Sequence, residues 1–157
     1  MKKTYWGDKG DPSPARESTT VHVEDLMIQR VVSLTRHQTV GHARELMQRL
    51  SIHSIPIVDG DGEPVGILTS ADLLSDVKDE TLIGQVMTRE VCTVARYAAP
   101  AVAAQLMRKH KIHHLVVTDE QKVVGVLSSY DLLQLVEEKR YVAKNRAAKT
   151  KKRVKRH

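Results

Sequence analysis

The sequence predicts a mixed α/β fold made of two β-α-β-β-α repeats that pack sheet to sheet about a pseudo-twofold axis. Two observations predict it. Residues 23–77 align with residues 83–136 with one gap in a turn, and both halves show strand-like and helix-like segments in the same order. A sheet with helices on one face leaves its other face bare, and a second copy of the unit covers that face.

Most of the positions that match between the repeats are apolar and suit the core of each unit. Four matched residues are not typical core residues: Gly66, Asp72, Gly125 and Asp131. We therefore expect function near these four positions.

The first repeat carries signals for a helical turn, three strands and two helices. Thr39 is a candidate helix N-cap before apolar residues at helical spacing, and the Asp-Gly-Asp-Gly sequence at residues 59–62 predicts a hairpin turn. The predicted elements are a helical turn at 23–27, a strand at 31–34, a helix at 40–50, strands at 54–58 and 64–69, and a helix at 70–77.

The second repeat copies this order. Pro100 stands at the start of a predicted helix, where its missing N–H costs nothing. The predicted elements are a helical turn at 83–87, a strand at 91–94, a helix from residue 99 onward, strands at 115–118 and 123–128, and a helix at 129–138.

Composition limits the class of protein. A chain of 157 residues is long enough for a compact domain with its own core, and that core must be aliphatic because the chain has no Phe, one Trp and four Tyr. The single cysteine, Cys92, excludes an internal disulfide and favours a reducing compartment. There is no apolar run of membrane-spanning length and no signal peptide, so we expect a cytoplasmic protein.

The two ends differ from the repeats in composition. Residues 1–20 are polar and contain Gly and Pro, which predicts a disordered leader before repeats at 21–78 and 79–138. Residues 139–157 hold ten Lys/Arg and no Asp/Glu, whereas the rest of the chain holds fifteen Lys/Arg against nineteen Asp/Glu. The excess positive charge therefore belongs to this basic C-terminal arm.

Each repeat carries one motif with chemical meaning, at residues 69–72 and 128–131. A strand ends in hydroxyl residues, and a carboxylate follows three residues later at a predicted helix start. Amides at a helix start favour an anion, and a carboxylate suits the vicinal hydroxyls of ribose, so the motif predicts a nucleoside phosphate site. The same spacing is a capping box, in which the two side chains satisfy each other's backbone donors, and both roles are compatible.

The doubled pattern resembles a tandem pair of cystathionine-β-synthase-type (CBS) domains, also called a Bateman module. The resemblance covers residues 21–138 and includes Ile-His-Ser-Ile-Pro-Ile-Val-Asp at 52–59 and Ile-His-His-Leu-Val-Val-Thr-Asp at 112–119. It implies a non-catalytic regulatory sensor that binds AMP, ADP, ATP or S-adenosylmethionine in clefts between the repeats. It also implies a homodimer, and no cofactor is required.

The resemblance further implies roles for individual residues. Ribose and phosphate contacts are implied for Thr69, Ser70, Asp72, Ser128, Ser129, Asp131, His53, His113 and His114. Adenine would be lined by Arg30, Val31, Ile52, Ser54 and Ile55, and in the other repeat by Glu90, Val91, Ile112 and Leu115.

Two departures from the family pattern are visible. Ser-Ile-Pro-Ile at residues 54–57 becomes His-Leu-Val-Val at residues 114–117, so the two clefts cannot be equivalent. Positions that hold Arg or Lys in many relatives hold His here, which makes phosphate affinity weaker near neutral pH and dependent on pH.

The histidines also raise the question of a metal. Neighbouring residues on a strand point to opposite faces, and no carboxylate stands at a spacing that would support a metal-bound His. We therefore predict no metal site. Likewise, no nucleophile with a placed base, phosphate-binding loop or pair of acids is visible, so an enzyme is not expected.

The basic arm leaves a second hypothesis open. It either binds the phosphates of nucleic acid or anionic lipid, or serves only as a solvated tail. The alternative function is a structural interaction protein with empty clefts, whose arm binds nucleic acid. The residues that would carry that binding are Lys149, Lys151, Lys152, Arg153, Lys155 and Arg156.

Overall fold

The structure is a computed structural model, and it describes residues 20–137. The leader at 1–19 and residues 138–157, with the six arm residues named above, lie outside the described residues. The elements are α1 (Val23–Leu26), α2 (Val40–Leu50), β1 (Ser54–Val58), β2 (Pro64–Thr69), the 3-10 helix η3 (Ser70–Leu73), α3 (Ile83–Val86), β3 (Thr93–Ala95), α4 (Pro100–His110), β4 (His114–Asp119) and β5 (Lys122–Ser128). Residues 129–137 are helical.

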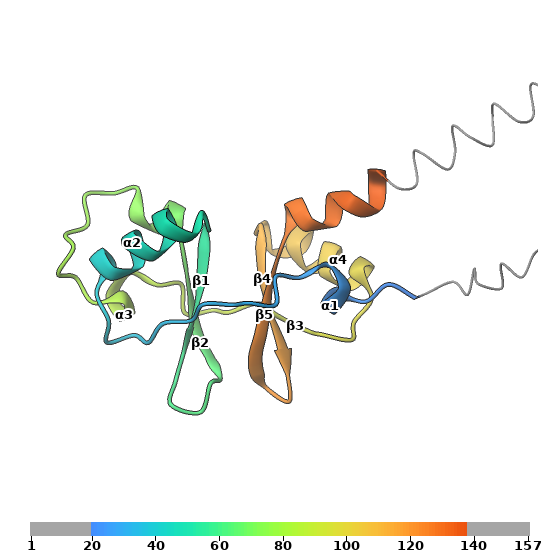
Figure 1. The fold of residues 1–157 in the computed structure, drawn as a ribbon, viewed down its shortest axis with the longest axis horizontal. Helices are drawn as coiled ribbons and strands as arrows, with labels where there is room; N and C mark the ends of the chain where they lie inside the picture. The colour runs from blue at the N-terminus through green and yellow to red at the C-terminus, as the bar shows by residue number, and fades with distance from the viewer. Residues whose placement is uncertain (1–19, 138–157) are drawn as a thin grey trace, which may run out of the picture.

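The predicted fold class is confirmed. Strands β1 and β2 form an antiparallel pair, and β3, β4 and β5 form a second sheet in which β3 runs parallel to β4. The two sheets stand next to each other in the middle of the molecule, and the helices lie on their outer sides (Figure 1). The turn between β1 and β2 is tied to the other repeat, because Val123 N donates to Gly62 O at 3.1 Å and Lys122 Nζ donates to Asp61 O at 2.6 Å.

The two long helices start and end as the sequence predicts. Thr39 Oγ1 accepts a hydrogen bond from His42 N at 3.4 Å, and Pro100 occupies the first turn of α4. Both helices end in a left-handed residue, Ser51 with φ 54° and Lys111 with φ 55°. The chain turns at that point and enters β1 or β4, which sets the start of each hairpin.

Three predicted elements are wrong in part. Of the strand predicted at residues 31–34, only Leu34 pairs, in a parallel bridge with Ile57, and residues 31 and 32 line the cleft described below. The helix predicted at 70–77 ends after η3, because the chain then runs to the start of α2, where Gly41 N donates to Asp79 O at 2.9 Å. In the second repeat, β3 begins at Thr93, two residues later than predicted.

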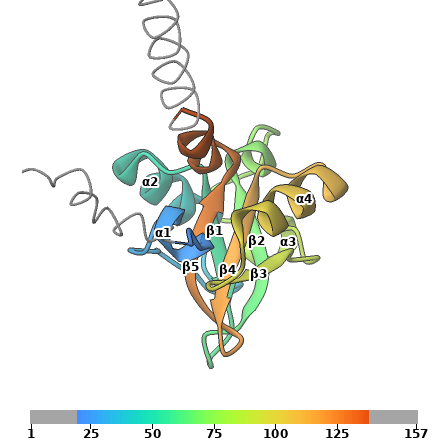
Figure 2. The ribbon, with the colours of Figure 1, turned by 90° about the vertical axis from the view of Figure 1, so that its right-hand side faces the viewer.

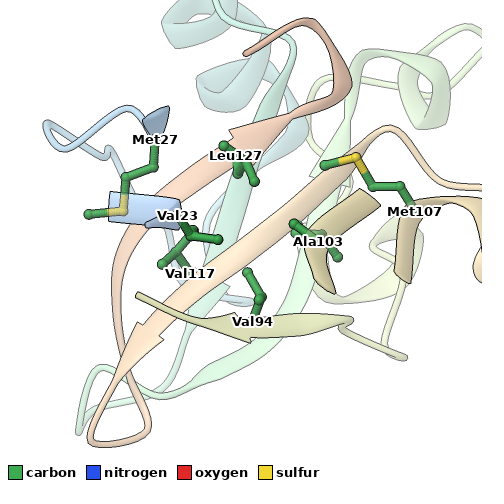
Figure 3. Packing of buried hydrophobic residues seen from close by; sticks show 8 residues of the cluster. Val23, Met27, Val94, Ala103, Met107, Val117 and Leu127 are labelled. Atoms are coloured by element: carbon green, nitrogen blue, oxygen red, sulfur yellow. The ribbon is translucent and has the colours of Figure 1, made fainter. Parts of the chain in front are cut away.

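The hydrophobic cores do not follow the order of the repeats. The core of the first repeat includes Ile83 from α3, and the core of the second repeat includes Val23 and Met27 from α1. Figure 2 shows α1 lying beside β5 in front of the second sheet, and Figure 3 shows Val23 and Met27 near Val117 and Leu127. The two short helices that lead into the repeats are therefore exchanged between them.

Backbone hydrogen bonds hold this exchange in the same way on both sides. Val23 N donates to Ala98 O at 2.9 Å, and Ile83 N donates to Gln38 O at 2.9 Å. The next residues repeat the pattern, since Glu24 N donates to Arg96 O and Gly84 N to Arg36 O. These bonds satisfy donors at the starts of α1 and α3 and fix where each helix docks.

The matched glycines have a packing role. A β-carbon on Gly66 would stand 2.5 Å from Met87 Sδ and 3.2 Å from Thr88 O, and one on Gly125 would clash with Met27 Sδ. Both glycines thus allow an exchanged segment to approach the strand closely. Gly66 and Gly125 therefore have a packing role, and function near these positions stays a prediction.

Among the described residues, no helix combines the length and the apolar character needed to cross a bilayer.

Candidate ligand cleft

A cleft of about 900 Å³ lies between the two repeats. Four parts of the chain line it: the segment that crosses from α1 to the first sheet, the end of α2 with the start of β1, the start of β4, and the end of β5 with the following helix. The lining residues are Ile28, Arg30, Val31, Val32, Leu50, Ser51, Ile52, His53, Ser54, His113, His114, Val126, Ser128, Ser129, Tyr130 and Asp131.

The cleft brings together residues predicted for two different roles. Residues of the adenine set from the first repeat and the hydroxyl and acid motif from the second repeat line the same cleft. The predicted residues that line it are Arg30, Val31, Ile52, His53, Ser54, His113, His114, Ser128, Ser129 and Asp131. The predicted adenine-lining residues of this cleft thus come from the first repeat, and the carboxylate of Asp131 comes from the second.

Other predicted residues do not line this cleft. Ile55 and Leu115 are fully buried in the two cores and are not among the residues that line this cleft, so a contact between their backbone and adenine stays a prediction. The remaining predicted residues outside the cleft are Thr69, Ser70, Asp72, Glu90, Val91 and Ile112.

Six lining residues were missed by the sequence analysis: Ile28, Val32, Leu50, Ser51, Val126 and Tyr130. Tyr130 is the most informative of them, since its side chain is 77% exposed beside Asp131. Alignment of the two repeats could have indicated Tyr130, because the matching residue of the first repeat is Ala71. A large aromatic residue at one copy of a motif and a methyl group at the other mark the copies as different sites.

The acid of each motif also serves as a cap. Asp131 Oδ2 accepts hydrogen bonds from Ser128 N at 2.7 Å and from Ser128 Oγ at 2.9 Å. Asp72 Oδ2 makes the same pair of bonds with Thr69, at 2.7 and 3.0 Å. The capping box is therefore present in both repeats, and it holds the carboxylate of Asp131 at the edge of the cleft.

Three imidazoles gather at the same cleft. Burial lowers the pKa of His114, and the neighbouring His113 and His53 lower it further, whereas Asp131 acts in the opposite direction. His113 Nδ1 lies 3.4 Å from Ser129 Oγ at the start of the last helix. The histidine that is most enclosed is therefore held neutral more strongly than a free imidazole.

No group of three or more His, Cys, Asp or Glu side chains within residues 20–137 is arranged to hold a metal ion.

Comparison of the sequence with models of known protein families identifies the family of this chain. The family model described as "CBS domain" matches residues 23–79 and again residues 83–138. The chain belongs to the CBS domain family. The two matches cover both repeats, so the chain contains a tandem CBS pair.

Curated relatives carry a similar pair within longer proteins. Homoserine O-acetyltransferase of Methanocorpusculum labreanum is 38% identical over 116 residues, which are 73% of this chain and 24% of that protein. Inosine-5′-monophosphate dehydrogenase of Methanocaldococcus jannaschii is 29% identical over 113 residues, 71% of this chain and 23% of that protein. The chain therefore matches about a quarter of the length of these enzymes.

Solved structures of CBS pairs resemble the chain along nearly their whole length. The CBS domain pair of protein MJ0100, in complex with 5′-methylthioadenosine and S-adenosyl-L-methionine, is 28% identical with a TM-score of 0.71, covering 76% of this chain and 98% of that one. A putative acetoin utilization protein from Vibrio cholerae is 32% identical with a TM-score of 0.71, covering 80% and 98%.

Proposed function

We propose that this CBS pair is a non-catalytic regulatory module that binds an adenosyl ligand in the cleft between its repeats. The adenine base would lie against Val31 and Ile52, and the ribose hydroxyls would bind Asp131. Binding would change the relative orientation of the two repeats and their contacts with any docked partner.

The observation that carries this proposal is the meeting of apolar residues and a hydroxyl and acid motif in one cleft. Ile28, Val31 and Ile52 supply apolar lining, and Ser128 and Asp131 supply polar lining. A nucleoside has this same division, with an apolar base face and a hydroxyl-rich sugar. The complex of the MJ0100 pair with two adenosyl compounds supports the choice of ligand class.

The test compares two matched variants, Asp131→Asn and Asp72→Asn. Both remove a carboxylate from a capping box and keep an oxygen that can accept the cap hydrogen bond, but only Asp131 lines the cleft. Wild-type protein at a ligand concentration of about 100 times Kd should gain about 2.7 kcal/mol of stability. Thermal shift with adenosine, AMP and S-adenosylmethionine should give this gain in Asp72→Asn and lose most of it in Asp131→Asn.

An unchanged gain in Asp131→Asn would remove the ribose assignment. The absence of any shift with every adenosyl compound would remove the proposed function as a whole. Incubation with ATP and chromatography of the nucleotides tests the non-catalytic part, since formation of any product would contradict it.

We further propose that the module forms a homodimer and acts in the cytoplasm. Leu74 and Leu133 occupy matching positions of the two repeats, and their side chains are 85% and 53% exposed. Two such apolar side chains on one molecule suit a surface that a second copy covers. Light scattering should give twice the mass of one chain, and Leu133→Glu should shift it toward the monomer.

A further inference from the structure

The charges that line the cleft are few and nearly cancel. Among the lining residues, Arg30 and Asp131 carry the only full charges that persist near neutral pH, and they are of opposite sign. The other ionisable groups there are Tyr130 and the three histidines, of which His114 is held toward its neutral form. The cleft therefore offers one permanent cation to a ligand.

The backbone amides at the start of the last helix are largely occupied. Ser128 N donates to Asp131 Oδ2 at 2.7 Å, Ser129 N to His113 O at 2.9 Å, and Asp131 N to Ser128 Oγ at 3.2 Å. A helix start with free amides would receive a phosphate group, but these three donors already have acceptors within the protein. The helix therefore adds little to the binding of a phosphate chain.

Much of the remaining lining is apolar, beside the hydroxyls of Ser51, Ser54, Ser128 and Ser129. Ile28, Val32, Leu50, Val126 and Tyr130 add apolar or aromatic surface to the cleft. An apolar surface favours a carbon or sulfur substituent on the ribose, and it leaves a charged chain without partners in place of its water.

We propose that this cleft selects adenosyl ligands that carry at most one phosphate group and discriminates against ADP and ATP. This inference rests on the proposed function and narrows it to a class of ligand: adenosine, its thioether or sulfonium derivatives, and the monophosphate. Each further phosphate adds negative charge that Arg30 alone cannot neutralise, while Asp131 repels it.

Isothermal titration of the full chain with adenosine, AMP, ADP, ATP and GTP, without magnesium and at 0.15 M salt, tests the proposal. Adenosine and AMP should bind with similar Kd, and ADP and ATP should bind at least about tenfold more weakly, which is the size of one missing charge-assisted hydrogen bond. If ATP binds as tightly as AMP, the proposed selection against further phosphate groups is wrong, whereas the proposed adenosyl site still stands. Failure of all four adenine compounds, or GTP that binds as tightly as AMP, would instead overturn the proposed function.

A gain-of-affinity experiment tests whether the small number of cations in the cleft is the cause of weak ATP binding. His53→Lys and His113→Lys each add a permanent cation at an exposed position of the cleft lining, and Gln105→Lys adds the same charge on the exposed side of α4. Within each histidine variant, the affinity for ATP relative to adenosine should rise by about tenfold over the wild-type ratio, and the Gln105→Lys control should leave that ratio unchanged. An equal gain in the control, or no gain in either histidine variant, would contradict selection by charge within the cleft.

Discussion

The thioether of Met27 occupies the space that a side chain at residue 125 would need. Met27 comes from the start of the first repeat, and Gly125 lies in β5 of the second repeat. Met87 and Gly66 repeat this relationship in the other direction, with Met87 Sδ 2.5 Å from the position of a β-carbon on Gly66. Each exchanged segment is thus held by a methionine that packs on a glycine.

The first prediction concerns these glycines. Gly125→Ala should lower the free energy of unfolding by about 1–3 kcal/mol, because the new methyl group displaces Met27 and presses on Ile28 O, which lies 3.0 Å from the β-carbon position. Gly60→Ala is the matched control, since nothing lies within 4 Å of its β-carbon position. Urea denaturation of both variants measures the difference, and equal stabilities would show that the methionine moves aside freely.

The second prediction tests the exchange itself. Val23 is fully buried in the core of the second repeat, so Val23→Ala should cost about 2 kcal/mol and speed amide hydrogen exchange in β4 and β5. Ile83→Ala should act on β1 and β2 instead, because Ile83 belongs to the core of the first repeat. Val102→Ala, at a side chain 43% exposed, should have little effect. Faster exchange in β1 and β2 after Val23→Ala would contradict the exchanged packing.

Local signals in the sequence were enough to predict most of the elements. The N-cap at Thr39, the proline at the start of α4 and the turn at residues 59–62 act within a few residues, so the sequence carries them directly. The helix predicted at 70–77 failed because a contact distant in sequence, between Gly41 and Asp79, directs that part of the chain.

The exchange of α1 and α3 was not predictable from the pattern, for a physical reason. Because the repeats are alike, Met27 has a suitable glycine in its own repeat, at Gly66, as well as in the other, at Gly125. Residue types alone cannot decide between two chemically equal partners. The path of the segment that crosses from α1 to the first sheet determines which glycine Met27 packs on. The same segment places Arg30 and Val31 in the cleft.

The third prediction separates two arginines that occupy matching positions of the repeats. Arg96 pairs with Glu24 at 2.8 Å and with Asp119 at 3.1 Å, and its hydrogen bonds with Asp119 and Glu24 raise the pKa of its guanidinium. Arg36 makes no such pair among the described residues. Arg96→Ala should therefore lower the melting temperature more than Arg36→Ala, since it leaves two partly buried carboxylates without a partner.

Differential scanning calorimetry at low and at high salt concentration measures this difference. Salt screens the charges that Arg96 balances, so the gap in melting temperature between the two variants should narrow at the higher salt concentration. A gap of the same size at both salt concentrations would show that Arg96 stabilises the fold by packing and not by its charge.

The fourth prediction concerns the pH dependence of stability. The pKa of His114 is lowered in the folded protein, mainly by burial, from its ordinary value of 6.5. The unfolded chain therefore binds a proton at a higher pH than the folded chain does, so stability is greatest above about pH 6.5 and falls as the pH drops below that value. Urea denaturation at pH 7.5, 6.5 and 5.5 should show this fall in the wild type.

The variant that tests the cause is His114→Gln, which keeps a polar side chain and cannot take up a proton in this range. Between pH 6.5 and pH 5.5, the stability of His114→Gln should fall less than that of the wild type. The stability of His37→Gln, at an exposed position outside the cleft, should fall as much as that of the wild type. Because His114 lies in the cleft with Asp131, a bound adenosyl ligand should change the decline in the wild type but not in His114→Gln. A decline of the same size in both variants would assign the pH dependence to groups other than His114.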